Sequence, residues 1–263
     1  MTLRIGVAGW AIPRPSAAAF PASGSGLERY ASRFNAVEVN STFYRSHRPA
    51  TLQRWAAVTP RDFRFAVKLS RAITHEARLV DTAPLVEAFV SAMTILGAKL
   101  GPILVQLPPS LAFEPTVADR FFGHMREVFG GAIVCEPRHQ TWFDQPADRL
   151  LAAHRIARVV ADPAPDPRAS QPGGWQGVAY WRLHGSPQTY VSAYQDPALA
   201  ALARTLRLSG AREAWCVFDN TARGAAAGNA LRLQGLLEVG GPRSPRHSTA
   251  SDIADQRAEP CPS

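Results

Sequence analysis

The chain has 263 residues, of which 46% are hydrophobic and 19% are charged, a balance typical of one large globular domain. Three cysteines are too few for a disulfide framework, and no uncharged apolar stretch approaches the roughly 20 residues that cross a membrane. We therefore expect a cytoplasmic protein without membrane contact. The net charge of +8 is compatible with nucleic acid or phosphorylated metabolites as partners, and equally with a basic surface that binds neither.

Short runs rich in β-branched and aromatic residues alternate with segments of helical periodicity along the chain. The runs that we predict as strands are 4–10, 36–40, 64–70, 103–107, 132–136, 158–162, 179–184 and 214–220. A helical pattern follows every run except the sixth. The segment that follows it, 163–177, is rich in Pro, Gly and Asp and predicts a loop with at most a short helix.

This order predicts an α/β fold, a single (β/α)8 TIM barrel over residues 1–239. A doubly wound sheet is the competing fold, but the first strand is not followed by the G-x-G-x-x-G spacing of a dinucleotide-binding loop. From Gly240 to Ser263 the chain is polar and without periodicity, which predicts a disordered C-terminal tail.

Alternation along each strand separates a face toward the helices from a face toward the barrel lumen. The apolar phase, which we expect under the helices, comprises Val37, Val39, Phe65, Val67, Ile103, Val105, Ile133, Cys135, Trp181, Leu183, Trp215 and Val217. The other phase carries polar and aromatic residues to the carboxyl-terminal mouth, where such barrels hold their active sites. Its last members are Trp10, Glu38, Asn40, Lys68, Gln106, Glu136, Arg138, Asp162, Arg182, His184 and Asn220, with His75 and His139 just past the strand ends.

Each of these residues has a structural explanation when taken alone, as a buried partner or a turn former. Together they indicate a functional pocket, because burying so many polar groups costs stability unless each is paired.

Five short motifs lie at or near the ends of the predicted strands. They are Phe34-Asn35-Ala36-Val37-Glu38-Val39-Asn40-Ser41-Thr42-Phe43-Tyr44, Phe63 to Lys68 with Thr74-His75, Gln106 to Ser110, Glu136 to His139 with Trp142, and Arg182 to Gly185. Together they resemble the YecE-like family, a group of unknown function, over about residues 4–237. The resemblance implies a TIM barrel of unestablished activity, compared on fold grounds with endonuclease-IV and xylose-isomerase-like barrels.

One position departs from the family pattern. Where the family usually reads F-N-N-T, this chain has Phe218-Asp219-Asn220-Thr221. Alternation places position 219 away from the lumen, so we do not expect the change to disable the site.

The leading functional hypothesis is an enzyme acting on a small phosphate- or carboxylate-bearing substrate by metal-independent acid/base chemistry. Arg138 and Arg182 offer the planar forks that grip such anions. We predict Lys68, Glu38, Glu136 and His184 as the catalytic residues, since burial and neighbouring cations lower the pKa of a lysine. The other residues predicted to contact substrate are Trp10, Asn40, Tyr44, Gln106, His139, Asp162 and Asn220.

Two other functions remain open. No cofactor is predicted, but His75, His139, His184, Glu136 and Asp162 are donors that a divalent metal would need, against competition from nearby cations. A bound metal favours a phosphodiesterase acting on nucleic acid. A non-catalytic binder of nucleic acid or nucleotides would instead use the basic, aromatic rim. The structural alternative to all three is a neutral network of ion pairs that orders the barrel mouth.

Overall fold

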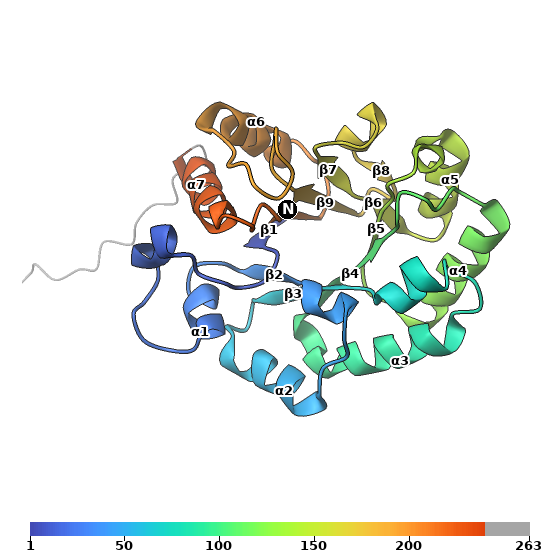
Figure 1. The fold of residues 1–263 in the computed structure, drawn as a ribbon, viewed down its shortest axis with the longest axis horizontal. Helices are drawn as coiled ribbons and strands as arrows, with labels where there is room; N and C mark the ends of the chain where they lie inside the picture. Colours follow the sequence, from blue (N-terminus) through green and yellow to red (C-terminus); the bar gives the residue numbers. More distant parts are fainter. Residues whose placement is uncertain (240–263) are drawn as a thin grey trace, which may run out of the picture.

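The computed structural model describes residues 1–239, whose strands form a closed parallel barrel (Figure 1). The strands are β1 (Thr2–Val7), β2 (Ala36–Val39), β3 (Arg64–Lys68), β4 (Leu100–Gln106), β5 (Ile133–Glu136), β6 (Ile156–Arg158), β7 (Val160–Asp162), β9 (Val178–Leu183) and β10 (Glu213–Phe218). Only Val159 separates β6 from β7, so the two pieces act as one strand and join the sheet β2-β3-β4-β5-β6 to the sheet β7-β9-β10-β1. The described strands therefore fill the eight barrel positions that the sequence predicts.

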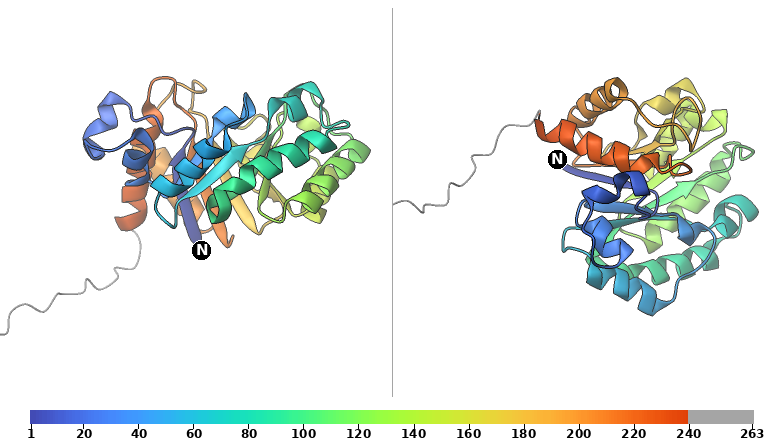
Figure 2. Two further views of the ribbon diagram at one scale, coloured as in Figure 1. Left: turned by 90° about the horizontal axis from the view of Figure 1, so that it is seen from below. Right: turned by 60° about the vertical axis from the view of Figure 1, so that its left-hand side comes forward.

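Within residues 1–239, seven α-helices surround the strands (Figure 2): α1 (Gly26–Ala31), α2 (Pro49–Val58), α3 (Ala83–Met93), α4 (Pro115–Val128), α5 (Gln145–Ala153), α6 (Asp196–Arg207) and α7 (Ala225–Val239). Five of them, α2 to α6, carry a proline in the first turn, where the missing N–H costs nothing and the fixed φ suits the helix. No helix in residues 1–239 is both long and apolar enough to span a bilayer.

The sixth connection carries no α-helix in its described residues 163–177. It holds one 3-10 turn, Pro167–Ser170, and the two-residue strand β8 (Gly173–Gly174), which pairs antiparallel with β6. The predicted barrel with a mostly looped sixth connection is therefore confirmed. The predicted tail, 240–263, lies outside the described residues.

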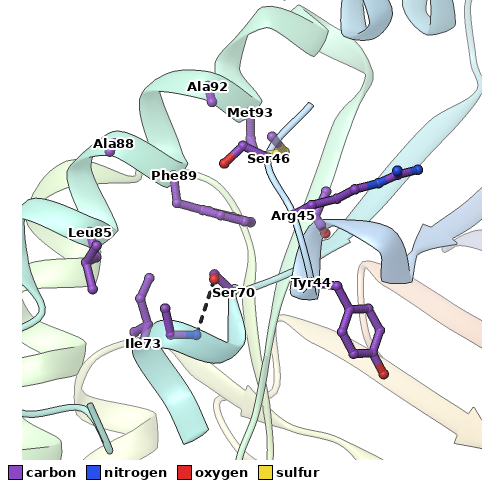
Figure 3. Close-up of a pocket in the computed structure, with 12 residues that line it drawn as sticks. Tyr44, Arg45, Ser46, Ser70, Ile73, Leu85, Ala88, Phe89, Ala92 and Met93 are labelled. Carbon is purple, nitrogen blue, oxygen red and sulfur yellow. Dashed lines mark hydrogen bonds between the residues drawn. The ribbon is translucent and has the colours of Figure 1, made fainter. Parts of the chain in front are cut away.

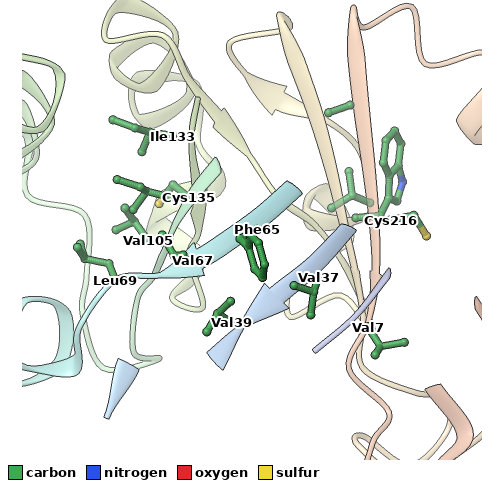
Figure 4. Packing of buried hydrophobic residues seen from close by; sticks show 14 of the residues in the cluster. Val7, Val37, Val39, Phe65, Val67, Leu69, Val105, Ile133, Cys135 and Cys216 are labelled. Atoms are coloured by element: carbon green, nitrogen blue, oxygen red, sulfur yellow. The ribbon is translucent and has the colours of Figure 1, made fainter. Parts of the chain in front are cut away.

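Two apolar layers flank the strands. The outer layer, between strands and helices, includes Val37, Phe65, Val105, Ile133 and Cys135 (Figure 4). The inner layer fills the lumen and includes Ala36, Ala66, Leu104, Val134 and Tyr180. The predicted phase is therefore confirmed for β2, β3, β4, β5 and β9.

The predicted phase of β10 is wrong. Trp215 and Val217 lie in the inner layer, whereas Cys216 and Phe218 belong to the outer one. Trp215 stacks on Tyr180, with ring centroids 5.8 Å apart. Both phases of β10 are apolar, so hydrophobic contrast could not distinguish the two faces of this strand.

The predicted phase of β7 is wrong as well. Ala161 is in register with Arg182 of β9, and Asp162 is in register with Leu183, which packs under the helices. Neighbouring residues of a parallel pair point to the same face, so Asp162 faces away from the lumen. This strand also lacks a polarity contrast, because its two phases are Val159 with Ala161 and Val160 with Asp162.

The seam between β1 and β2 has little hydrogen bonding of its own. A single isolated bridge, Ala8 to Glu38, links these strands. The hydroxyl of Tyr30, from α1, accepts a hydrogen bond from the Val7 N–H at 2.8 Å and donates one to the Ala36 carbonyl at 2.9 Å. A helix side chain thus completes the barrel where the strands alone do not.

Candidate functional site

Arg182 stands at the centre of a buried charge cluster at the mouth. It comes from the inward phase of β9, and only 1% of it is exposed. Its Nε and Nη2 donate to the Glu38 carboxylate at 2.9 and 2.6 Å, and Nη1 donates to Glu136 at 2.6 Å. Nη2 also reaches Asp219 at 3.0 Å. Burial opposes the charge of the guanidinium, but Glu136, Glu38 and Asp219 outweigh burial and raise the pKa of Arg182.

His184 lies between two carboxylates. Its Nε2 is 2.8 Å from Glu136 Oε1, and its Nδ1 is 3.1 Å from Asp219 Oδ2. Only the imidazolium form donates from both nitrogens at once. Burial alone would lower the pKa of His184, but the carboxylate of Glu136 and the hydrogen bonds to Asp219 and Glu136 outweigh burial and raise it. Arg138 Nη2 also lies 3.1 Å from Nε2 and opposes a charge there, but the contacts with two carboxylates favour the imidazolium.

Glu136 and Glu38 use all their oxygens within the cluster. Glu136 accepts a further hydrogen bond from Arg138 Nη2 at 2.9 Å, and Glu38 accepts one from the Tyr180 hydroxyl at 2.8 Å. Burial would raise the pKa of Glu136, but Arg182, Arg138 and His184 hold it well below its usual range. Both carboxylates are buried, and the hydrogen bonds to their oxygens come from cluster members.

Lys68, at the end of β3, has a different environment. Its Nζ lies 4.2 Å from the centroid of the Phe43 ring, and within residues 1–239 it forms no ion pair. Burial and the charge of Arg182 lower the pKa of Lys68, and the carboxylates of the cluster oppose them only in part. His75 contacts the same Phe43 ring edge-on at 5.0 Å. Lys68 is thus a cation of the mouth without a counter-ion of its own among the described residues.

Three further polar atoms just past the strand ends are buried and lack a hydrogen-bond partner among residues 1–239. They are Arg138 Nε, Asn40 Oδ1 and Asn220 Oδ1. Arg138 nevertheless keeps a fifth of its side chain exposed, so its guanidinium faces both Glu136 and solvent. At the mouth, the carboxylates of Glu38 and Glu136 thus have all their hydrogen bonds within the protein, whereas Lys68 and Arg138 still have N–H groups without a partner among the described residues.

Several residues predicted to contact substrate form contacts within the protein outside the charge cluster. Trp10 packs edge-on against Trp55 of α2 at 4.9 Å, and Gln106 Nε2 donates to the Leu107 carbonyl at 3.2 Å. The His139 Nδ1 accepts from the Thr141 N–H at 3.3 Å and so caps a 3-10 turn. None of these contacts belongs to the charge cluster.

Tyr44 lies at the edge of a separate cavity. Its side chain is exposed, and it borders a cavity of about 350 Å³ that also contacts Arg45, Ser70 and helix α3 (Figure 3). The predicted aromatic residue is therefore on the rim, beside the loops that follow β2 and β3.

Asn220 was predicted to face the mouth and Asp219 to face away from it, and the structure shows the reverse. Because β10 has the opposite phase, Asp219 points into the mouth and contacts Arg182 and His184. Asn220 turns toward α7, where its Nδ2 donates to Asn229 Oδ1 and to the Ser192 carbonyl, both at 2.9 Å. The expectation that position 219 faces away from the lumen was wrong.

The predicted metal donors are not assembled. Of His75, His139, His184, Glu136 and Asp162, hydrogen bonds join only His184 and Glu136, and Arg182 and Arg138 already occupy that carboxylate. Within residues 1–239 no three His, Cys, Asp or Glu side chains gather with the geometry of a metal site. A metal bound between these residues would have to displace the arginines.

Sequence reasoning missed three members of the mouth. Tyr180 shares the inward phase of Arg182 and His184, so alternation could have found it. Asp219 was not among the predicted mouth residues because the predicted phase of β10 turned its side chain away from the lumen. Phe43, whose ring lies under the Lys68 ammonium group, follows the end of β2, and no periodic pattern in the sequence indicates its position.

Comparison with known proteins adds a family and a fold. The family model described as "Protein of unknown function DUF72" matches residues 4–251. The UPF0759 protein YecE of Escherichia coli (strain K12) is 32% identical over 145 residues, which cover 53% of this chain and 53% of that protein. The chain thus spans about half the length of the curated relatives that it matches.

Two solved structures agree with the barrel. A DUF72 family protein from Enterococcus faecalis, 20% identical, aligns with a TM-score of 0.77 over 92% of this chain and 99% of that one. A xylose isomerase-like TIM barrel/4-hydroxyphenylpyruvate dioxygenase fusion protein, 15% identical, aligns with a TM-score of 0.54 over 91% of this chain and 44% of that one. At these identities the likeness concerns the fold alone.

Proposed function

This chain belongs to the DUF72 family of proteins of unknown function, and from that premise we propose that its barrel mouth binds a small anionic substrate and transforms it by acid/base chemistry of protein side chains. The resemblance to the YecE-like family that the motifs predicted is confirmed by the relatives named YecE. Since the family carries no assigned reaction, the proposal rests on the chemistry of the mouth.

The observation that carries the proposal is that the positive and negative groups at the mouth do not balance. The mouth holds four cationic groups: Arg182, Arg138, Lys68 and the imidazolium form of His184. They face three carboxylates, those of Glu38, Glu136 and Asp219. The cluster therefore has one positive charge in excess. A purely structural ion-pair network accounts for the carboxylates and for Arg182. It does not account for Lys68, a mostly buried cation held without a counter-ion, because such an arrangement costs stability. A substrate with one phosphate or carboxylate group supplies the missing charge.

The geometry suggests how the roles are divided. Arg138, with its unpartnered Nε and its exposed edge, holds the anionic group of the substrate. Lys68 exchanges a proton with the substrate, because a lowered pKa brings the neutral amine closer to working pH. Sequence reasoning made Glu38 and Glu136 catalytic and Arg182 a substrate-binding residue. We assign all three to positioning instead, since their hydrogen bonds are already made within the protein.

A metal-dependent phosphodiesterase has less support from the arrangement. Its central carboxylate, Glu136, is bonded to Arg182, Arg138 and His184, so a metal would compete with three cations. A non-catalytic nucleic-acid binder is supported only by the net charge. The experiment below therefore distinguishes these two alternatives from the proposed function.

The test is a thermal-shift and calorimetric screen of sugar phosphates, nucleotides and small carboxylates against wild type, Lys68→Met and Arg138→Ala. The matched control is Arg204→Met, on the exposed face of α6. We expect a ligand whose affinity falls about tenfold or more in both mouth variants, which is about 1.4 kcal/mol each, and is unchanged in the control. The pH at which turnover of that ligand is half-maximal should then change in Lys68→Arg.

Three results would contradict the proposal. Folded Lys68→Met and Arg138→Ala proteins that bind every ligand as the wild type does would remove the mouth from function. Nucleic-acid binding that falls steeply with salt but survives both changes would identify a non-catalytic binder. Activity on nucleic acid that a chelator abolishes would identify a metal-dependent enzyme.

A further inference from the structure

A second cavity lies at the opposite end of the barrel from the mouth. It has a volume of about 380 Å³ and is bounded by residues at the starts of β9 and β10, by the segment before β5, and by the ends of α4 and α5. Three arginines, Arg126, Arg155 and Arg212, line it together with Trp175. Because the strands run away from this end, the cavity is separate from the charge cluster at the mouth.

The charge of this cavity is not balanced by protein carboxylates. The one acidic residue in its lining, Glu213, accepts from Arg4 Nε at 3.1 Å. Arg155 and Arg212 are exposed and form no ion pair within residues 1–239. A surplus of guanidinium groups around a concave surface favours an anionic ligand.

Arg126 has a role that differs from that of the other two arginines. It donates to the backbone carbonyls of His154, Phe129, Gly131 and Arg155 at 2.7–3.1 Å, so it caps the ends of α4 and α5. The partial negative charge at these helix ends accounts for this one cation. It does not account for Arg155 and Arg212.

The backbone on either side of the cavity is held in place. Arg155 has a left-handed conformation, with φ 55°, and its N–H donates to the Ala152 carbonyl while its own carbonyl accepts from Arg126. The Trp175 ring lies directly over Gly177, where an added Cβ would come within 2.0 Å of the ring. The cavity therefore has an aromatic side chain in its wall beside the arginines.

We propose that this cavity is a binding site for a nucleotide, whose phosphates contact Arg155 and Arg212 and whose planar base packs against Trp175. Guanidinium forks match phosphate oxygens in two-point fashion, and indole rings stack on bases. The volume is in the range of small-ligand sites, whereas a duplex would need an extended surface.

The test is calorimetric titration of the full chain with ADP and, separately, with inorganic pyrophosphate. The double variant Arg155→Asn, Arg212→Gln keeps a residue that tolerates the left-handed conformation and removes both charges. Arg204→Gln and Arg149→Gln, exposed arginines of α6 and α5, are the matched controls. We expect ADP affinity to fall at least tenfold in the double variant and to be unchanged in both controls and in Arg138→Ala.

The alternatives give different results. If Arg138→Ala abolishes ADP binding and the double variant does not, the nucleotide binds at the mouth, which overturns this site but supports the proposed function. Equal losses in the controls would indicate a diffuse effect of surface charge and also overturn it. Pyrophosphate that binds as tightly as ADP would rule out a base against Trp175. Binding of a long RNA, but of neither small probe, would assign the arginines to a nucleic-acid surface instead.

Discussion

His184 illustrates how single contacts determine charge at the mouth. Its two nitrogens face Glu136 and Asp219, and Tyr190 covers the ring edge-on at 5.5 Å. Replacing a buried ion pair by apolar residues is often harmless, but removing one partner leaves an uncompensated charge. Asp219 is the member of the cluster whose removal tests this most directly, since it contacts both His184 and Arg182.

We expect Asp219→Asn to lower the pKa of His184, because a neutral amide replaces the anion opposite Nδ1. Burial alone works against the imidazolium, so the remaining charge of Glu136 must hold it. The variant should also lose roughly 2 kcal/mol of stability, typical of a buried hydrogen bond between charged groups. NMR titration of the His184 ring and urea unfolding measure the two effects.

Asp196→Asn is the matched control, since Asp196 pairs with Arg232 at the surface. It should leave the His184 titration unchanged. A His184 pKa that is the same in Asp219→Asn and wild type would show that Asp219 does not maintain the imidazolium.

At the scale of elements, the barrel depends on where its strands join. The β1–β2 seam has one isolated bridge, and a Cβ on Gly6 would come within 2.1 Å of the Ala36 carbonyl oxygen, so the two backbones are in close contact there. The buried Tyr30 hydroxyl joins the two strands. Helix α1 therefore contributes to closure of the sheet as well as to its cover.

Tyr30→Phe should destabilise the protein by about 2–3 kcal/mol, because the buried Val7 N–H and Ala36 carbonyl lose a shared partner. Hydrogen exchange at the Val7 amide should accelerate more than exchange at amides of β4. Urea unfolding measures the first effect and NMR exchange the second. Tyr44→Phe, at an exposed tyrosine, serves as the control and should change neither. A Tyr30→Phe protein as stable as wild type would mean that water replaces the hydroxyl at the seam.

For the whole molecule, the mouth cluster links segments far apart in the chain. Glu38 comes from β2, Glu136 from β5, Arg182 from β9, and Asp219 follows β10. The cluster therefore connects opposite sides of the barrel, and its ionisation affects the stability of the complete fold.

The stability of the protein should fall on acidification. The arginines and His184 outweigh burial and lower the pKa of Glu136 and Asp219, so their contribution is complete above the unfolded value of about 4. It is lost as the pH falls through the lower folded values. His184 has the opposite sign: its pKa is raised, so its contribution is lost as the pH rises through the folded value.

Urea unfolding from about pH 7 to pH 3 measures this dependence. A Glu136→Gln, Asp219→Asn double variant should be less stable at neutral pH and show a flatter decline in acid. The surface carboxylate of Asp166, whose pKa Arg168 lowers to about 2, should give wild type and variant a common residual slope. Parallel curves for the two proteins would show that the mouth carboxylates do not control acid stability.

The sequence by itself determined the order of strands and helices, the looped sixth connection and the inward phase of β2, β3, β4, β5 and β9. Alternation is a local property, and it predicts which side chains point inward wherever one face of a strand is polar and the other apolar. For this reason the strand pattern alone assigns Glu38, Lys68, Glu136, Arg182 and His184 to one mouth.

Only the tertiary structure decided which of these groups are already satisfied. The phases of β7 and β10 were ambiguous because both faces of these strands are largely apolar, and the places of Asp162, Asp219 and Asn220 depend on them. Whether a carboxylate faces a guanidinium or a substrate depends on distances across the lumen between segments more than 40 residues apart, such as Glu136 and Arg182. No local pattern encodes those distances, because they arise when the barrel closes.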